Sequence, residues 1–435
     1  MDPITIIGAG LAGCEAAWQI AKRGGEVILY EMKPEFYSPA HRSPFFAELV
    51  CSNSFKSESI ENASGILKEE MRQLESLILK VAKETKVPAG DSLAVDREIF
   101  SKEITQVLEN LKNVEVIRQE VTSIPKEGIT IIATGPLTSE ALSQEIQKLT
   151  GTCHLFFYDA ISPIVTADSI NFQKAFKFSR YGKGGEDYVN CPMDKEKYYQ
   201  FVEALNGAEK VPTRHFEKRH LFEGCLPIEE MASRGKDTLA HGPLKPVGLI
   251  DPKTGRQPFA VVQLRQEDRF ETLFNLVGFQ TRLKHEEQKR VFRMIPGLEH
   301  AEFVRLGSTH RNTFIDSPRW LRESLQMKDH PDLFLAGQIT GVEGYMESTA
   351  MGLLSGINAH RYTKGMAPVV PPRTTAMGAL IYYITHSITL PFQPMNINFG
   401  LFPPLSGKSR GREKRLLLAE RALKELGSWK ERSEG

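Results

Sequence analysis

The sequence has few cysteines, no long apolar run and almost no net charge. Its cysteines are odd in number, far apart and never spaced Cys-x-x-Cys: Cys14, Cys51, Cys153, Cys191 and Cys225. This pattern argues against a disulfide framework and against a structural zinc site. No apolar stretch approaches the roughly 20 residues that cross a bilayer, and no signal peptide precedes the strand that begins at Ile4. We therefore expect a reduced, cytoplasmic protein with no metal and no membrane partner.

The charge balance excludes a uniformly basic surface for nucleic acid. Lys and Arg number 55 against 54 Asp and Glu, which leaves a net charge of +1. Any basic surface must therefore be local, and three clusters qualify: residues 210–220, 282–293 and 407–415. Phe216 or Phe222 could stack on an everted base. One such cluster alone is more often a solvated helix face, whereas the three together favour an RNA partner.

The first 31 residues predict a strand, a helix and a second strand that surround a glycine-rich turn. The run ITII suits a buried parallel strand, alanines at helical spacing follow it, and EVILYE forms the second strand. The turn has the pattern G-x-G-x-x-G and consists of Gly8, Ala9, Gly10, Leu11, Ala12 and Gly13. Its glycines permit a tight turn, close approach to a pyrophosphate and close helix packing. Glu31, at the end of the second strand, can accept hydrogen bonds from a ribose hydroxyl.

Two later segments repeat the combination of a buried strand and a glycine. IIATG (131–135) and FLAGQ (334–338) resemble the outer fingerprints of FAD-binding flavoproteins of the glutathione-reductase type. This resemblance favours FAD over NAD and adds Gly135, Gly337 and Gln338 to the predicted FAD-binding residues. That family usually has Asp where this chain has Gln338.

The pattern along the chain predicts an α/β fold with two domains. We expect a Rossmann-like FAD-binding domain from residues 1–150 and 301–435, with an inserted α+β tRNA and substrate domain at 151–300. Helical periodicity predicts helices at 62–83 and 97–111, and the segment 412–429 predicts an amphipathic helix.

Longer motifs narrow the resemblance to one group of bacterial tRNA-modifying flavoproteins. LVCSNSFKS (49–57), GCLPIEEMASRGKDTLAHGPLKPVGL (224–249) and AGQITGVEGYMESTAMGLLSG (336–356) resemble the folate-dependent tRNA (uracil-5-)-methyltransferases. The related wobble-uridine-modifying group lacks the insertion. The resemblance implies methylation of uridine 54 in the tRNA T-loop. It also implies methylenetetrahydrofolate as one-carbon donor and FAD that is reduced by NADPH or NADH.

The resemblance also implies a pair of catalytic cysteines. Carbon 5 of uracil is a poor nucleophile until a thiolate adds to carbon 6, and the proton on carbon 5 must later leave. We assign Cys225 as the nucleophile and Cys51 as the base, although the sequence leaves open which does which. For either residue the plain alternative is a small buried hydrophobe. Lys56, Arg219 and Arg234 are candidate cations that could lower a thiol pKa.

Some assignments have plain structural alternatives, which for Tyr345 carry equal weight. Tyr345 could stack on the folate pterin or could be an ordinary buried tyrosine. His310 and Arg311 could line the same site or belong to a charged loop. Two other functions also fit the sequence, an NAD(P)H-dependent flavoprotein oxidoreductase for a small molecule and a non-catalytic tRNA chaperone. The sequence does not indicate the oligomeric state.

Overall fold

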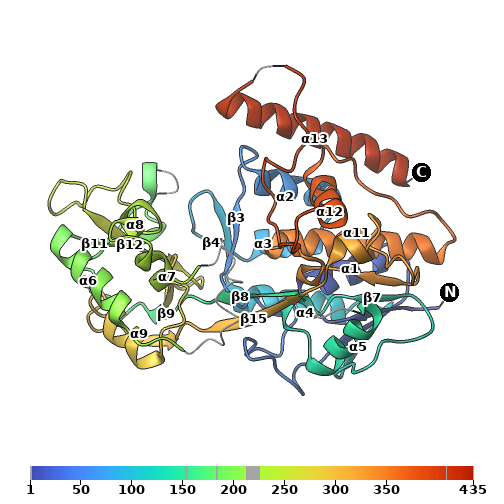
Figure 1. Cartoon of the computed structure of the whole chain (residues 1–435), viewed down its shortest axis with the longest axis horizontal. Coiled ribbons are helices and arrows are strands. Elements are labelled where there is room, and N and C mark those ends of the chain that lie inside the picture. Colours follow the sequence, from blue (N-terminus) through green and yellow to red (C-terminus); the bar gives the residue numbers. More distant parts are fainter. Residues whose placement is uncertain (1, 152–154, 183–184, 212–225, 408, 435) are drawn as a thin grey trace.

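The computed structural model describes every residue except 1, 152–154, 183–184, 212–225, 408 and 435. Figure 1 shows two lobes of unequal size, with the strands β8 and β15 running between them. Both ends of the chain lie in the larger lobe, while the smaller lobe is formed by the middle of the sequence.

The larger lobe is built on a parallel sheet of five strands in the order β16-β7-β1-β2-β6. Its strands are β1 (Ile4–Ile7), β2 (Val27–Glu31), β6 (Val114–Arg118), β7 (Thr130–Ile132) and β16 (Leu333–Leu335). Most of these short runs are apolar and buried, as parallel strands covered by helices require. Because β16 pairs with β7, the sheet joins the two ends of the sequence. The predicted Rossmann-like α/β class is confirmed.

Two helices pack closely because small residues lie between them. A Cβ atom at Gly352 of α11 (Tyr345–Thr363) would lie 2.1 Å from the carbonyl oxygen of Ala12 in α1 (Leu11–Ala21). A Cβ at Gly356 would lie 2.7 Å from the carbonyl oxygen of Ala16. Glycine therefore sets the spacing of these helices. The other helices of this lobe are α2 (Ala63–Gln73), α3 (Leu77–Glu84), α4 (Arg97–Glu109), α5 (Glu140–Thr150), α10 (Ser317–Trp320), α12 (Ala376–His386) and α13 (Gly411–Glu434).

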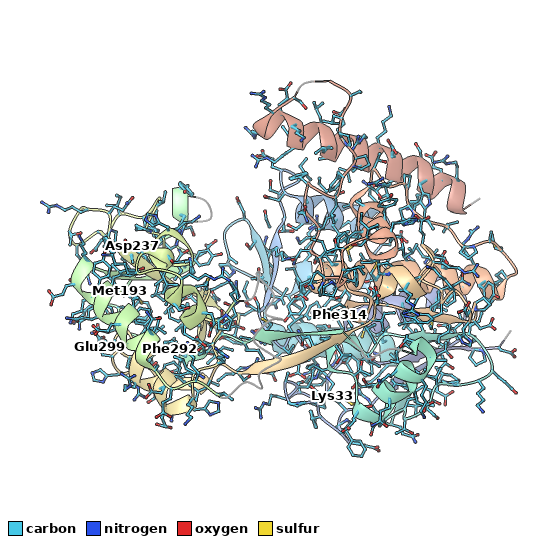
Figure 2. The ribbon with its side chains drawn as sticks, viewed as in Figure 1. Lys33, Met193, Asp237, Phe292, Glu299 and Phe314 are labelled. Atoms are coloured by element: carbon cyan, nitrogen blue, oxygen red, sulfur yellow. The ribbon has the colours of Figure 1, made fainter. Side chains whose placement is uncertain are left out.

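The smaller lobe contains an antiparallel sheet of six strands in the order β10-β11-β12-β13-β9-β14. Its strands are β9 (Ile164–Thr166), β10 (Phe176–Lys177), β11 (Tyr188–Met193), β12 (Ala260–Gln266), β13 (Leu273–Leu276) and β14 (Phe303–Arg305). The helices α6 (Lys195–Gly207), α7 (Ile228–Ser233), α8 (Thr238–His241) and α9 (His285–Phe292) accompany it. Figure 2 places Met193 and Phe292 in this lobe, and both belong to its own buried core. The domain boundaries at 150 and 301 remain a prediction.

Two small sheets lie beside the large ones. Strand β8 (Leu155–Ala160) pairs with β15 (Thr309–Phe314), and β3 (Ser54–Ser57), β5 (Ser92–Val95) and β4 (Lys86–Val87) form a three-stranded sheet. Figure 2 places Phe314, the last residue of β15, in the larger lobe.

One predicted helix is wrong in detail. Instead of a single helix over 62–83, the chain forms α2 and α3, which are separated at residues 74–76. The predicted C-terminal helix is confirmed as α13, which lies over α2 and α12 in Figure 1. Among the described residues, no helix is long and apolar enough to cross a membrane.

Candidate active site

The glycine-rich sequence forms the turn between β1 and α1. Gly8 has a φ of +99°, and a Cβ there would lie 2.9 Å from the carbonyl oxygen of Ala133. A Cβ at Gly13 would lie 1.8 Å from the carbonyl oxygen of Gly8, so no larger residue fits there. At Gly10, by contrast, no atom of the described residues lies within 4 Å of a Cβ position. The turn therefore leaves open space at the N-terminus of α1, where backbone N–H groups favour an anion.

This open space belongs to a cavity at the carboxyl end of the parallel sheet, which we call the nucleotide cavity. Every predicted FAD-binding residue except Gly13 lines it: Gly8, Ala9, Gly10, Leu11, Ala12, Glu31, Gly135, Gly337 and Gln338. Tyr345, the residue predicted to stack on folate, also lines it. Gly13 instead packs beneath the turn. The free helix N-terminus, the space at Gly10 and the acidic residue at the rim fit an FAD dinucleotide.

Glu31 also holds the turn in shape. Its buried carboxylate accepts hydrogen bonds from the N–H of Ala9 and from the N–H of Lys33, each at 3.0 Å. The carboxylate therefore lies at the rim of the nucleotide cavity with a fixed orientation. Its contact with a ribose stays a prediction.

The glutamine at position 338 has a structural explanation. Its side-chain Nε2 donates to Oε2 of the buried Glu343 at 2.5 Å. A carboxylate at position 338 would lie beside the buried Glu343 carboxylate, and two like charges this close repel each other. The amide therefore suits a chain that has an acid at position 343.

A second hollow of about 450 Å³ adjoins the nucleotide cavity, and we call it the thiol chamber. Cys51 and Lys56 line it, while Gln338 and Tyr345 line both spaces. The described part of the chain contains two other cysteines, Cys14 and Cys191, and both are fully buried. Burial raises the pKa of each thiol, that of Cys191 to about 12. Cys51 is thus the described cysteine best placed for chemistry.

The backbone around Cys51 is held by a tyrosine hydroxyl. The Tyr345 Oη accepts hydrogen bonds from the N–H of Cys51 at 2.8 Å and from the N–H of Ser52 at 3.2 Å. Burial raises the pKa of Tyr345, and the neighbouring Cys51 raises it further. The ring also contacts Phe55 edge to face, with centroids 5.8 Å apart. Tyr345 therefore connects the wall of the nucleotide cavity to the cysteine loop, and its stacking on a pterin remains a prediction.

The other lobe also holds this loop. On β12, the Arg265 Nη2 donates to Ser52 Oγ at 2.8 Å, and its Nε donates to Asn53 Oδ1 at 2.9 Å. The fully buried Asn53 donates in turn to the carbonyl oxygens of Val95 and Gln266. The thiol chamber therefore lies where strands of both lobes meet.

Two arginines near Cys51, Arg97 and Arg305, were not predicted from the sequence. Arg97 donates to the carbonyl oxygen of Leu49 at 2.7 Å and pairs with Glu267 at 2.6 Å. Burial alone would lower the pKa of Arg97, but the nearby Glu267 carboxylate outweighs burial, so the pKa is raised. Burial and the charge of Arg97 lower the pKa of Arg305, whose charge also acts on Cys51. For Arg97 the sequence offered one signal. It is the first residue of α4, where a positive charge opposes the helix dipole and therefore needs another stabilising partner.

The remaining predicted residues fall into two groups. Lys56 lines the thiol chamber and lies 3.5 Å from the carboxylate of Glu347, whereas Arg234 directly follows α7. Cys225, Arg219, Phe216, Phe222 and Cys153 lie outside the described residues. His310 and Arg311 lie in β15, where their side chains are not described, but the next residue, Asn312, lines the chamber. No group of three or more potential metal ligands occurs among the residues that the structure describes.

The fold and the nucleotide cavity define a flavoprotein of the Rossmann type that binds FAD. The family model described as glucose inhibited division protein A matches residues 3–367. The chain is 60% identical over 427 residues to the methylenetetrahydrofolate–tRNA-(uracil-5-)-methyltransferase TrmFO of Geobacter sulfurreducens, which covers 98% of both chains. It is 59% identical over 430 residues to the TrmFO of Desulforamulus reducens, which covers 99% of this chain and 98% of that one. The structure of Aquifex aeolicus GidA has the same fold, with a TM-score of 0.71 at 18% identity over 98% of this chain and 73% of that one.

This chain belongs to the glucose inhibited division protein A family and, within it, to the methylenetetrahydrofolate–tRNA-(uracil-5-)-methyltransferases. The resemblance inferred from the sequence motifs is therefore confirmed.

Proposed function

We propose that this protein methylates carbon 5 of a uracil in tRNA, with methylenetetrahydrofolate as one-carbon donor and reduced FAD as reductant. The target is uridine 54 of the T-loop. The observation that carries the proposal is the common wall of the two spaces, because Tyr345 and Gln338 line both the nucleotide cavity and the thiol chamber that holds Cys51. A thiol, a flavin and a uracil can therefore meet at one carbon atom.

The chain's own groups account for the steps on the uracil ring. The thiolate of Cys225 adds to carbon 6, so that a C–S bond forms and the electron pair moves towards carbon 5. Carbon 5 then bonds to the one-carbon unit, the bond from this unit to the folate nitrogen breaks so that tetrahydrofolate leaves, and Cys51 accepts the proton that carbon 5 loses. The C–S bond breaks when the methylated uracil leaves. Bound FAD, reduced by NADPH or NADH, supplies the hydride that completes the methyl group.

Cys225 lies outside the described residues, but the segment after it supports its assignment. The N–H of Ile228 donates to the carbonyl oxygen of Gln280 at 2.7 Å, and Gln280 lines the thiol chamber. The described segment that follows Cys225 in the sequence is therefore bonded to the wall of the chamber.

The surroundings of Cys51 suit a group that carries negative charge for part of the cycle. The guanidinium groups of Arg97 and Arg305 interact electrostatically with Cys51, and Lys56 lines the same chamber. Nearby cations favour a thiolate.

Label transfer tests the function. The protein is incubated with FAD, NADPH, methylene-labelled methylenetetrahydrofolate and an unmodified tRNA transcript, and 5-methyluridine is sought in the T-loop. Cys225→Ala should abolish labelling while FAD stays bound. If NADPH is consumed while tRNA stays unlabelled, an oxidoreductase for a small molecule becomes the better explanation. Full activity of Cys225→Ala would refute the role of this thiol.

A further inference from the structure

One of the three basic clusters of the sequence is largely neutralised by acidic side chains in the fold. Within residues 282–293, Lys289 pairs with Glu286 at 3.0 Å and Arg290 pairs with Glu287 at 2.6 Å. Each pair joins residues three positions apart on one face of α9. This helix therefore offers little free positive charge to a phosphate backbone.

Positive charge gathers elsewhere, in a groove of about 1180 Å³ at the C-terminal end of α1. We call it the basic groove. Seven lysine and arginine side chains line it, against two glutamates, which leaves an excess of five positive charges in a chain whose net charge is +1. Lys22 and Arg23 directly follow α1, and Lys80 and Lys83 extend from α3.

The other cations come from parts of the sequence that are far apart. Arg72 belongs to α2, Lys86 to β4 and Arg361 to the end of α11. Trp429 of α13 also lines the groove. Because five helices and a strand contribute, no continuous sequence motif predicts this surface.

Only part of the positive charge in the groove is paired with acidic side chains of the protein. Its two acids are already paired, Glu58 with Arg72 and Lys86, and Glu75 with Lys22. The exposed side chains of Lys80 and Lys83 make no hydrogen bond or ion pair with any residue in the described part of the chain. These two ammonium groups, one helical turn apart, are available to an anionic partner.

The groove begins close to the thiol chamber. Lys56 lines the chamber and Glu58 lines the groove, and the two residues lie two positions apart at the end of β3. Two positions along a chain lie at most about 7 Å apart. A polyanion that places one nucleotide in the chamber can therefore continue along the groove.

We propose that the basic groove binds the phosphate backbone of tRNA outside the target nucleotide. The inference rests on the proposed function and adds the surface that holds the substrate. Several exposed cations spread along an open groove suit a chain of phosphates better than a single small anion, which requires a compact cradle of donors. The contact is independent of RNA sequence, because phosphates carry no base information.

The test compares two double variants that each remove two positive charges from an exposed helix. Lys80→Ala/Lys83→Ala alters the groove, and Lys289→Ala/Arg290→Ala alters the neutralised face of α9. The affinity for unmodified tRNA is measured between low and high salt, together with the KM for tRNA, the KM for methylenetetrahydrofolate and the FAD content. The groove variant should bind tRNA roughly ten-fold more weakly at low salt and lose about one unit of salt slope per lysine. Its FAD content and folate KM should stay at the wild-type values, and the α9 variant should resemble the wild type throughout.

Three results would overturn the inference. The groove variant could keep the wild-type salt slope, the α9 variant could lose as much affinity as the groove variant, or the groove variant could lose FAD together with tRNA. Failure of the methylation proposal has a different signature, since wild-type protein would then form no 5-methyluridine. The tRNA affinities of the two variants would still decide the role of the groove.

Discussion

Replacing Tyr345 by phenylalanine tests whether its hydroxyl positions the cysteine loop. The change keeps the ring that lines both cavities and removes the acceptor of two backbone hydrogen bonds, from Cys51 and Ser52. Each lost bond costs about 1 kcal/mol, and water in the hollow chamber recovers part of it. We therefore expect the free energy of unfolding to fall by about 1–2 kcal/mol. The loop keeps its bonds from Arg97 and Arg265, so it should loosen but stay in place.

The effect on catalysis should exceed the effect on binding. A displacement of the thiol by a fraction of an ångström to 1 Å lowers kcat by roughly ten-fold to a hundred-fold, while the KM for folate and the FAD content change little. Initial rates of label transfer to tRNA and denaturant unfolding measure the two quantities. Tyr383→Phe is the matched control, because its hydroxyl donates to the carbonyl oxygen of Gln393 at 2.8 Å and the residue lines neither cavity. It should lose about 1 kcal/mol and keep its kcat. Wild-type kcat in Tyr345→Phe would refute the positioning role of the hydroxyl.

Three other changes test the remaining parts of the site. Gly13→Ala should lower the free energy of unfolding by about 3 kcal/mol or more, because its Cβ would overlap the backbone, and denaturant unfolding measures this loss. Gly10→Ala should fold normally and lose FAD affinity by roughly ten-fold or more, which a flavin-fluorescence titration measures. Gln338→Glu places a second carboxylate beside Glu343, so FAD retention should fall at pH 8 and recover partly at lower pH; equal retention at both would contradict the explanation. Burial lowers the pKa of Lys68 from its ordinary value of 10.5 to about 7, so the unfolded state binds a proton that the folded state lacks between these values. Stability should therefore rise with pH from about 7 to 10 by up to about 1.4 kcal/mol per unit, and Lys68→Met should flatten this rise in unfolding curves.

The nucleotide half of the site could be predicted because its determinants are local. One short stretch contains the turn at Gly8, the helix that follows and the acid at Glu31. The residue type at each of these places follows from the local backbone, so the sequence pattern is sufficient to predict it. Gly337, just before Gln338, could also be predicted to line the site, since a buried strand followed by glycine is typical of the edge of a parallel sheet.

The break between α2 and α3 could not be predicted, because a distant residue causes it. The buried carboxylate of Glu15 on α1 accepts hydrogen bonds from Ser76 Oγ at 2.7 Å and from the N–H of Ile78 at 3.1 Å. Glu75 takes a φ of +58° at this break. Helical periodicity continues through the segment, so sequence alone predicts one helix. The break matters for function because it directs the lysines of α3 into the basic groove.

The same reasoning explains why the position of the cysteine loop could not be predicted, although its motif LVCSNSFKS carried the family resemblance. Its backbone is bonded to α11 through Tyr345 and to β12 through Arg265, two elements far apart in the sequence. The position of Cys51 relative to the nucleotide cavity therefore depends on how the parallel sheet of one lobe meets the antiparallel sheet of the other. In the proposed function, the loop thus holds Cys51 at the junction of the two lobes and next to the nucleotide cavity. A substitution in β12 that never touches FAD should thus slow methylation as much as one in the loop itself.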